Sequence, residues 1–139
     1  MSSAAALYTP EVLALATGLA GYPLSDGLAL RGSARAPLCG STIAIGLALD
    51  ADERIAGLGI KAHACAIGQA AAGIFAAAAR GQDRAGIAKA LAEVELWLTD
   101  EGAGLPDWPG LSAIAAARAY PARHGAILLP WKAALSALP

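Results

Sequence analysis

Large apolar and small side chains alternate most clearly in the middle of the chain. From Ile43 to Leu49 every second position carries a large apolar residue, and alanine or glycine stands between them. A period of two predicts a β-strand over residues 42–49, with one face on a core and the other nearly bare. A similar pattern over residues 54–64 follows four polar residues, which predicts an antiparallel hairpin. A weaker strand pattern over residues 27–36 precedes both.

Helical signals flank these strands on both sides. Thr9, Pro10 and Glu11 are typical of an N-cap, a first-turn proline and a first-turn acid, and Asp83 is a second predicted N-cap. Pro130 should kink the last helix, because its ring meets the carbonyl group four residues earlier. The predicted helices cover residues 10–20, 66–79, 83–100, 111–119 and 123–138.

The order of these elements is a helix, three strands and then helices, which is typical of an α+β fold. The 139 residues predict a single domain, 1–139, in which a three-stranded antiparallel sheet packs against four to five helices. Apolar residues make up 57% of the chain and charged residues 15%, which excludes intrinsic disorder. Because most of the apolar residues are alanines, we expect a core of tightly packed small side chains.

Charge and hydropathy exclude several classes of partner. The net charge is −1 and the ten Lys and Arg residues are scattered singly, so we expect no nucleic-acid binding. The uncharged stretch 62–79 approaches the length of a membrane span, but its many alanines and glycines predict weak affinity for lipid, so we expect no membrane segment. The first residues lack a basic region and Glu11 interrupts them, so we expect no signal peptide and a cytoplasmic location. In that compartment two cysteines indicate a metal or sulfur site more than a disulfide bond.

Few side chains could carry chemistry, namely Cys39, Cys65, His63 and His124, with Ser41, Arg35 and Arg123 near them in sequence. There are no paired carboxylates on a helix face, no phosphate-binding loop and no nucleophile elbow, so we do not expect an enzyme. Cys39 lies in a tight Pro/Gly segment between two predicted strands and should face solvent. Cys65 lies where a strand ends and a helix begins, where the helix dipole and free N–H groups favour a thiolate.

Each of these residues also has a purely structural interpretation. A free cysteine is often a small buried hydrophobe, and a single histidine is more often structural or exposed than a ligand. His63 and Cys65 are two residues apart and would share a face if both lay in a strand. Only a fold that brings the separate segments together favours a common site.

Four segments, taken in succession, resemble the iron–sulfur cluster assembly scaffold family of the NifU, IscU and SufU type. They are Thr-Pro-Glu at 9–11, Pro-Leu-Cys-Gly-Ser-Thr-Ile at 37–43, Ala-His-Ala-Cys-Ala-Ile-Gly-Gln-Ala at 62–70 and Arg-His-Gly-Ala-Ile-Leu-Leu-Pro-Trp at 123–131. The block around Cys65 is the most specific, and the resemblance covers almost the whole chain. It implies a small antiparallel sheet covered by helices.

In that family three cysteines meet at one exposed end, accept sulfur from a cysteine desulfurase and hold iron, zinc or a nascent 2Fe–2S cluster. Cys39 matches the first cysteine, Cys65 matches the second, and His124 resembles the histidine that often precedes the third. The resemblance implies that Cys39 is the sulfur acceptor, and that Cys39, Cys65 and His124 bind iron, a transient 2Fe–2S cluster or zinc. It also implies a cysteine desulfurase as partner and a protein that is a monomer or a weak homo-oligomer.

The chain departs from the family at the ligands themselves. The third cysteine falls on Gly125 or, with a shift of one residue, on Ala126, and the family's aspartate is Ser41. A 2Fe–2S cluster needs four terminal ligands, whereas zinc needs three from protein if water takes the fourth place. Losing a thiolate weakens cluster retention, so the residues favour a labile or zinc-bearing site over a stable cluster.

Two alternatives remain open at this point. His63 would be a fourth ligand, giving a Cys2His2 site, if its ring turned inward. The whole chain would instead be a degenerate paralogue if it keeps the fold and binds a cysteine desulfurase or another sulfur-pathway protein without holding a cluster.

Overall fold

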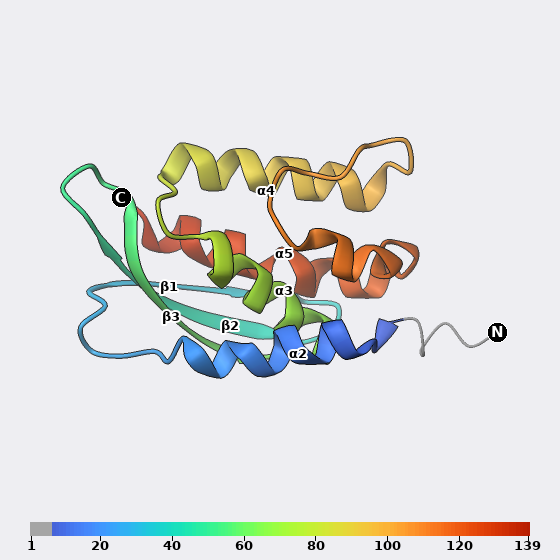
Figure 1. Ribbon diagram of the computed structural model, residues 1–139, viewed down its shortest axis with the longest axis horizontal. Coiled ribbons are helices and arrows are strands. Elements are labelled where there is room, and N and C mark those ends of the chain that lie inside the picture. The colour runs from blue at the N-terminus through green and yellow to red at the C-terminus, as the bar shows by residue number, and fades with distance from the viewer. Residues whose placement is uncertain (1–6) are drawn as a thin grey trace.

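The computed structural model describes residues 7–139, in which the strands form an antiparallel sheet of order β1–β2–β3 (Figure 1). The strands are β1 (Leu30–Arg35), β2 (Thr42–Leu49) and β3 (Ile55–His63). The predicted strand over residues 42–49 is confirmed at both ends, and its large residues Ile43, Ile45 and Leu47 are buried on the inner face. The predicted hairpin is also confirmed, since β2 and β3 pair antiparallel.

The helices lie close to their predicted positions. Thr9 caps the first helix by accepting a hydrogen bond from the Val12 N–H at 3.1 Å, and Asp83 caps a later one by accepting from the Gly86 N–H at 2.8 Å, so both predicted N-caps are confirmed. No helix within residues 7–139 is both long enough and apolar enough to cross a membrane. The helical elements are α2 (Pro10–Gly18), η1 (Leu19–Gly21), α3 (Ala66–Ala78), α4 (Arg84–Thr99), η2 (Leu111–Ala119) and α5 (Pro121–Ala137).

One predicted helix is present but interrupted. A helix is predicted over residues 111–119, and η2 covers these residues, but its geometry is 3-10 and Ile114 breaks it with non-helical backbone angles (φ −110°, ψ 17°). Leu111, Ile114 and Ala117 are its buried residues, and they are three positions apart. The kink at Ile114 divides η2 into two short pieces, and 3-10 helices are usually short.

The helices are layered on the inner face of the sheet. α5 packs directly on β1 and β2, α3 packs against α5 and β3, and α4 lies beyond them, farthest from the sheet (Figure 1). α2 runs beside α3. The close approach of α5 depends on Gly32 in β1, where an added Cβ would collide with the Ala133 carbonyl and would lie 2.7 Å from the Ala137 nitrogen.

The core combines small side chains with a cluster of three aromatic rings. Several alanines of α3 are fully buried, in line with the prediction of a core of small residues. Phe75, Trp108 and Trp131 lie with each pair of ring centroids 5.4 Å apart, and the Trp108 Nε1–H donates to the Ile74 carbonyl at 3.0 Å. This aromatic cluster ties α3, α5 and the loop before η2 together.

The outer face of the sheet is covered only in part. The Ile60 N–H donates to the Tyr22 carbonyl at 2.8 Å, and the following segment 23–28 then crosses over Gly46 and Gly59. An added Cβ at Gly46 would lie 2.9 Å from the Leu24 side chain, so the two glycines make room for the segment. The end of the outer face next to residues 35–42 remains open.

Candidate functional site

Cys39 lies in the turn that joins β1 to β2, at one end of the sheet. Gly40 has φ +71°, a left-handed conformation that glycine adopts without strain, and its N–H donates to the Ala36 carbonyl at 2.8 Å. The Ala36 N–H in turn donates to the Ser41 carbonyl at 2.9 Å. The turn is therefore held by its own backbone, and it presents Cys39 to solvent as the sequence predicts.

The side chain of Cys39 contacts that of Ser41. The Cys39 Sγ is 3.2 Å from the Ser41 Oγ, and Ser41 is only 5% exposed. Hydrogen bonds from the Ser41 side chain and backbone lower the pKa of the Cys39 thiol, and the Arg123 charge contributes in the same direction. When the thiol loses its proton, the serine hydroxyl can turn to donate to the sulfur, which stabilises the thiolate.

Cys65 is the N-cap residue of α3, which confirms its predicted place at the junction of strand and helix. Its backbone is extended (φ −63°, ψ 170°), its side chain makes no capping hydrogen bond, and it is half-buried against the core. β3 ends at His63, so Cys65 lies beyond the strand, and His63 and Cys65 do not share a strand face. His63 instead lies with Lys61 on the outer face of the sheet, and both are exposed.

His124 lies in the first turn of α5 and is half-buried. Its Nε2 is 3.0 Å from the Arg118 carbonyl oxygen, at the end of η2. Because a carbonyl only accepts, the ring donates Nε2–H in this arrangement. A neutral His124 ring then has only Nδ1 available to bind a metal ion.

The start of α5 lies between the two segments that carry the cysteines. A Cβ added at Gly125 would lie 3.1 Å from the Cβ of Ala36, beside the Cys39 turn. A Cβ added at Gly68, in the first turn of α3, would lie 3.1 Å from the Cβ of Ala126. Gly125 and Ala126 are the two positions on which the family's third cysteine falls. Gly125 therefore faces the Cys39 turn and Ala126 faces the first turn of α3, but neither residue has a donor atom in its side chain.

Convergence of these segments does not by itself produce a metal site. Within residues 7–139 no group of three or more His, Cys, Asp and Glu side chains is arranged to hold a metal ion. Cys39, Cys65 and His124 are consequently not a ready-made three-ligand set in this structure. His124 would have to leave the Arg118 carbonyl, or use Nδ1, to join the two sulfurs.

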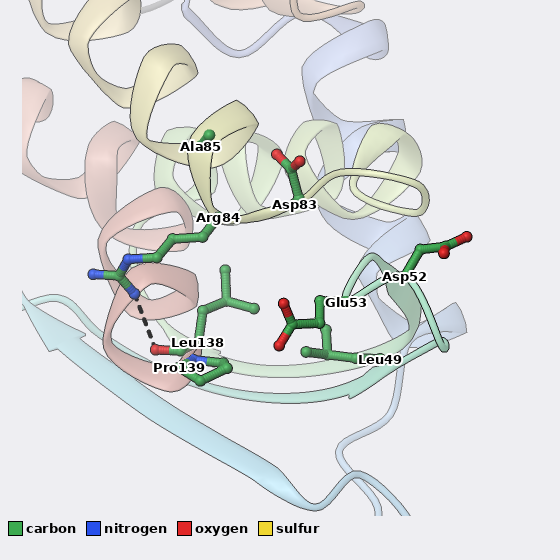
Figure 2. Close-up of a pocket in the computed structure, with 8 residues that line it drawn as sticks. All are labelled: Leu49, Asp52, Glu53, Asp83, Arg84, Ala85, Leu138 and Pro139. Atoms are coloured by element: carbon green, nitrogen blue, oxygen red, sulfur yellow. Dashed lines mark hydrogen bonds between the residues drawn. The ribbon is translucent and has the colours of Figure 1, made fainter.

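A separate pocket of about 310 Å³ lies at the other end of the β2–β3 hairpin (Figure 2). The guanidinium of Arg84 donates to the Leu138 carbonyl at 2.9 Å and to the Leu135 carbonyl at 3.1 Å, and so satisfies two carbonyls at the C-terminal end of α5. Asp83 already caps α4. Among residues 7–139, no cysteine or histidine lines this pocket, and the Arg84 side chain in its wall joins α4 to the end of α5.

Lys61 is not among the site residues predicted from the sequence, and Arg35 is predicted only as a sequence neighbour of the candidate residues. Alternation along β1 and β3 is the sequence signal that could have placed Arg35, Lys61 and His63 on one face of the sheet, because residues at every second position of paired strands share a face. The register pairs Arg35 with Thr42 and Thr42 with His63, which places all three in one row across the sheet.

Comparison with known proteins finds similarity in structure but not in sequence families. No family model matches the chain, and no curated protein is significantly similar to it. A NifU-like protein (N-terminal) from Brucella abortus superposes with a TM-score of 0.80 at 24% identity, over 98% of this chain and 94% of that one.

Two further solved structures share the arrangement. A putative iron–sulfur cluster assembly scaffold protein for the SUF system from Fervidobacterium islandicum gives a TM-score of 0.81 at 18% identity, over 96% of this chain and 97% of that one. A hypothetical protein gives 0.65 at 19% identity, over 91% and 95%. At these identities the comparisons establish a shared fold, and they confirm the predicted α+β architecture.

Proposed function

We propose that this protein acts in iron–sulfur cluster assembly as a scaffold-type protein in which Cys39 accepts sulfur from a cysteine desulfurase. The observation that carries the proposal is the environment of Cys39, an exposed thiol in a turn closed by two backbone hydrogen bonds, with its sulfur 3.2 Å from the hydroxyl of Ser41. The fold shared with a NifU-like protein and a SUF scaffold protein supports the same assignment. Such a protein carries sulfur and does not turn over a substrate of its own.

The chemistry is a transfer of one sulfur atom between two cysteines. The Cys39 thiolate attacks the outer sulfur of a persulfide on the donor, a new S–S bond forms, and the donor's own S–S bond breaks. The donor cysteine leaves as a thiolate, and Cys39 becomes a persulfide that keeps the transferred proton. No net oxidation or reduction takes place, so no other reactant is required.

Iron, zinc or a transient 2Fe–2S cluster is the cargo that this site would receive. Cys39 and Cys65 supply two thiolates, and His124 supplies an imidazole nitrogen once its ring turns toward them. Since positions 125 and 126 contribute no donor, we expect the cargo to be held weakly and released readily.

Sulfur transfer is tested with a cysteine desulfurase loaded with sulfur-35 cysteine under anaerobic conditions. The wild-type chain and Cys65→Ser should gain one labelled sulfur atom, found on Cys39 by peptide mass spectrometry, and Cys39→Ser should gain none. Equal labelling of Cys39→Ser and the wild type would overturn the assignment of Cys39.

A second candidate function has direct support in the absence of a three-donor group among residues 7–139. In this case the chain binds a cysteine desulfurase or another sulfur-pathway protein without carrying a cluster. Anaerobic incubation with desulfurase, cysteine and ferrous iron separates the two candidates. A scaffold gains iron, acid-labile sulfide and visible absorption, whereas an interaction protein gains none of these and keeps its partner affinity in Cys39→Ser.

A further inference from the structure

The open end of the outer sheet face forms a shallow depression of about 440 Å³. It lies beyond the part of the face that segment 23–28 covers. All three strands contribute side chains to it, and the exposed ends of Arg35, Lys61 and His63 make up its charged and imidazole groups. The polar and small residues between them are Ser33, Thr42 and Ala44.

The register gives this depression the shape of a trough. Arg35, Thr42 and His63 form one row across the strands, and Ser33, Ala44 and Lys61 form the next. The middle strand thus contributes only short side chains, while β1 and β3 on either side contribute long cationic ones. Two strand spacings separate those sides by about 10 Å, which is wide enough for one extended peptide chain.

The charge of the trough is positive although the chain as a whole carries −1. Among residues 7–139, no Asp or Glu lines the trough. The acids nearest in the hairpin sequence, Asp50, Asp52 and Glu53, lie in the turn at the opposite end of β2. A cationic surface attracts carboxylates and steers an acidic partner during encounter. Two or three positive groups are too few to track a nucleic-acid backbone.

The trough also borders the reactive thiol. The turn that carries Cys39 begins after Arg35 and ends before Thr42, and both residues line the trough. Beside the thiol in the same turn, Leu38 is 91% exposed, more than any other large apolar side chain described. A partner peptide bound along the trough would therefore reach Cys39 and Leu38 at one end.

We infer that this trough docks an extended acidic segment of the protein that delivers sulfur to Cys39. The inference rests on the proposed function, because it names the chemistry by which that donor is recognised. Carboxylates of the segment pair with Arg35 and Lys61, and an apolar side chain beyond them meets Leu38. Docking there holds the donor persulfide next to the thiol and raises the rate of transfer through proximity.

The test compares two double charge reversals with the same change in net charge. Arg35→Glu/Lys61→Glu alters the trough, whereas Lys89→Glu/Lys132→Glu alters exposed lysines of α4 and α5, on the helical side of the molecule. Sulfur transfer to Cys39 is measured at low salt with two donors, a persulfide-loaded cysteine desulfurase and free cysteine persulfide. The small donor needs no docking surface, so the ratio of the two second-order rate constants isolates the contribution of docking.

We expect the trough reversal to lower that ratio by about tenfold and the control reversal to leave it within about twofold. Added salt should lower the wild-type ratio toward that of the trough variant. Equal ratios for the two reversals would overturn the docking inference while the proposed function stands. If the wild type accepts sulfur from neither donor, the proposed function fails instead.

A binding measurement tests recognition of an acidic segment by the trough separately from sulfur transfer. The wild-type chain is titrated with an extended Glu-Ser peptide and, separately, with single-stranded DNA, and backbone amide shifts are followed by NMR. We expect the peptide to shift signals of residues 33–35, 42–44 and 61–63, and Arg35→Glu/Lys61→Glu to lose these shifts. Shifts elsewhere, or shifts caused by DNA alone, would overturn the inference.

Discussion

At the scale of single residues, the reactivity of Cys39 depends on the side chain at position 41. The resemblance places an aspartate there, whose negative charge would oppose a neighbouring thiolate. Ser41 is neutral and nearly buried, and its hydroxyl is 3.2 Å from the sulfur. Serine in place of aspartate at position 41 therefore favours the Cys39 thiolate, which is the form that attacks a persulfide.

Ser41→Ala should raise the pKa of Cys39, because it removes the largest of the interactions that lower it. With Cys65 replaced by serine so that one thiol remains, the rate of alkylation by iodoacetamide is measured against pH. We expect the profile to move to higher pH and the rate at pH 7 to fall about threefold. Ser33→Ala, which removes a hydroxyl from β1 instead, is the control, and identical profiles for the two variants would contradict the role of Ser41.

At the scale of elements, glycines decide which surfaces of the sheet are covered. Gly59 in β3 lies under segment 23–28, where an added Cβ would collide with the Pro23 carbonyl and would lie 2.8 Å from the Leu24 Cα. Gly57 lies two residues away on the same face, where an added Cβ would make only ordinary contacts of 3.6 and 3.8 Å. The two positions form a matched pair that differs in the space above the strand.

Gly59→Ala should destabilise the protein by about 1–3 kcal/mol, because the backbone of segment 23–28 has to move away from β3. Gly57→Ala should change the free energy of unfolding by less than about 1 kcal/mol. Thermal and urea unfolding followed by circular dichroism measure both. Equal losses in the two variants would show that segment 23–28 does not rest on Gly59.

The sequence predicts most elements because their signals are local. Thr9 and Asp83 mark helix starts through their own side chains, and the alternation from Ile43 to Leu49 marks β2. The helix over residues 111–119 is predicted, but its 3-10 geometry and its kink at Ile114 are not, because nine residues with many alanines fit both helix types. Local periodicity separates helix from strand more sharply than it separates one helix type from another.

At the scale of the whole molecule, the candidate site depends on how α5 packs against the rest. The resemblance predicts that Cys39, Cys65 and His124 lie at one end of the fold, and the start of α5 lies between the two cysteine segments. The resemblance does not predict that the His124 ring donates to the Arg118 carbonyl. That hydrogen bond joins residues of two helices, and no pattern in the sequence indicates which way the His124 ring turns.

The same packing indicates how a stronger metal site could be made. A Cβ at Gly125 would lie 3.1 Å from the Cβ of Ala36, a tight contact that a shift of a few tenths of an ångström relieves, and it would point toward the Cys39 turn. Gly125→Cys therefore adds a third thiolate next to the first one. Gly125→Ala introduces the same Cβ without the sulfur and is the matched control.

Gly125→Cys should bind zinc at least about tenfold more tightly than the wild type and Gly125→Ala, because a third thiolate completes a set that otherwise depends on His124. Competition with a chromogenic chelator measures the affinities, and anaerobic reconstitution shows whether the variant retains a 2Fe–2S cluster that the wild type releases. Adding Cys39→Ser to the variant should abolish the gain. If Gly125→Cys binds zinc no better than Gly125→Ala, then position 125 does not share a metal site with Cys39.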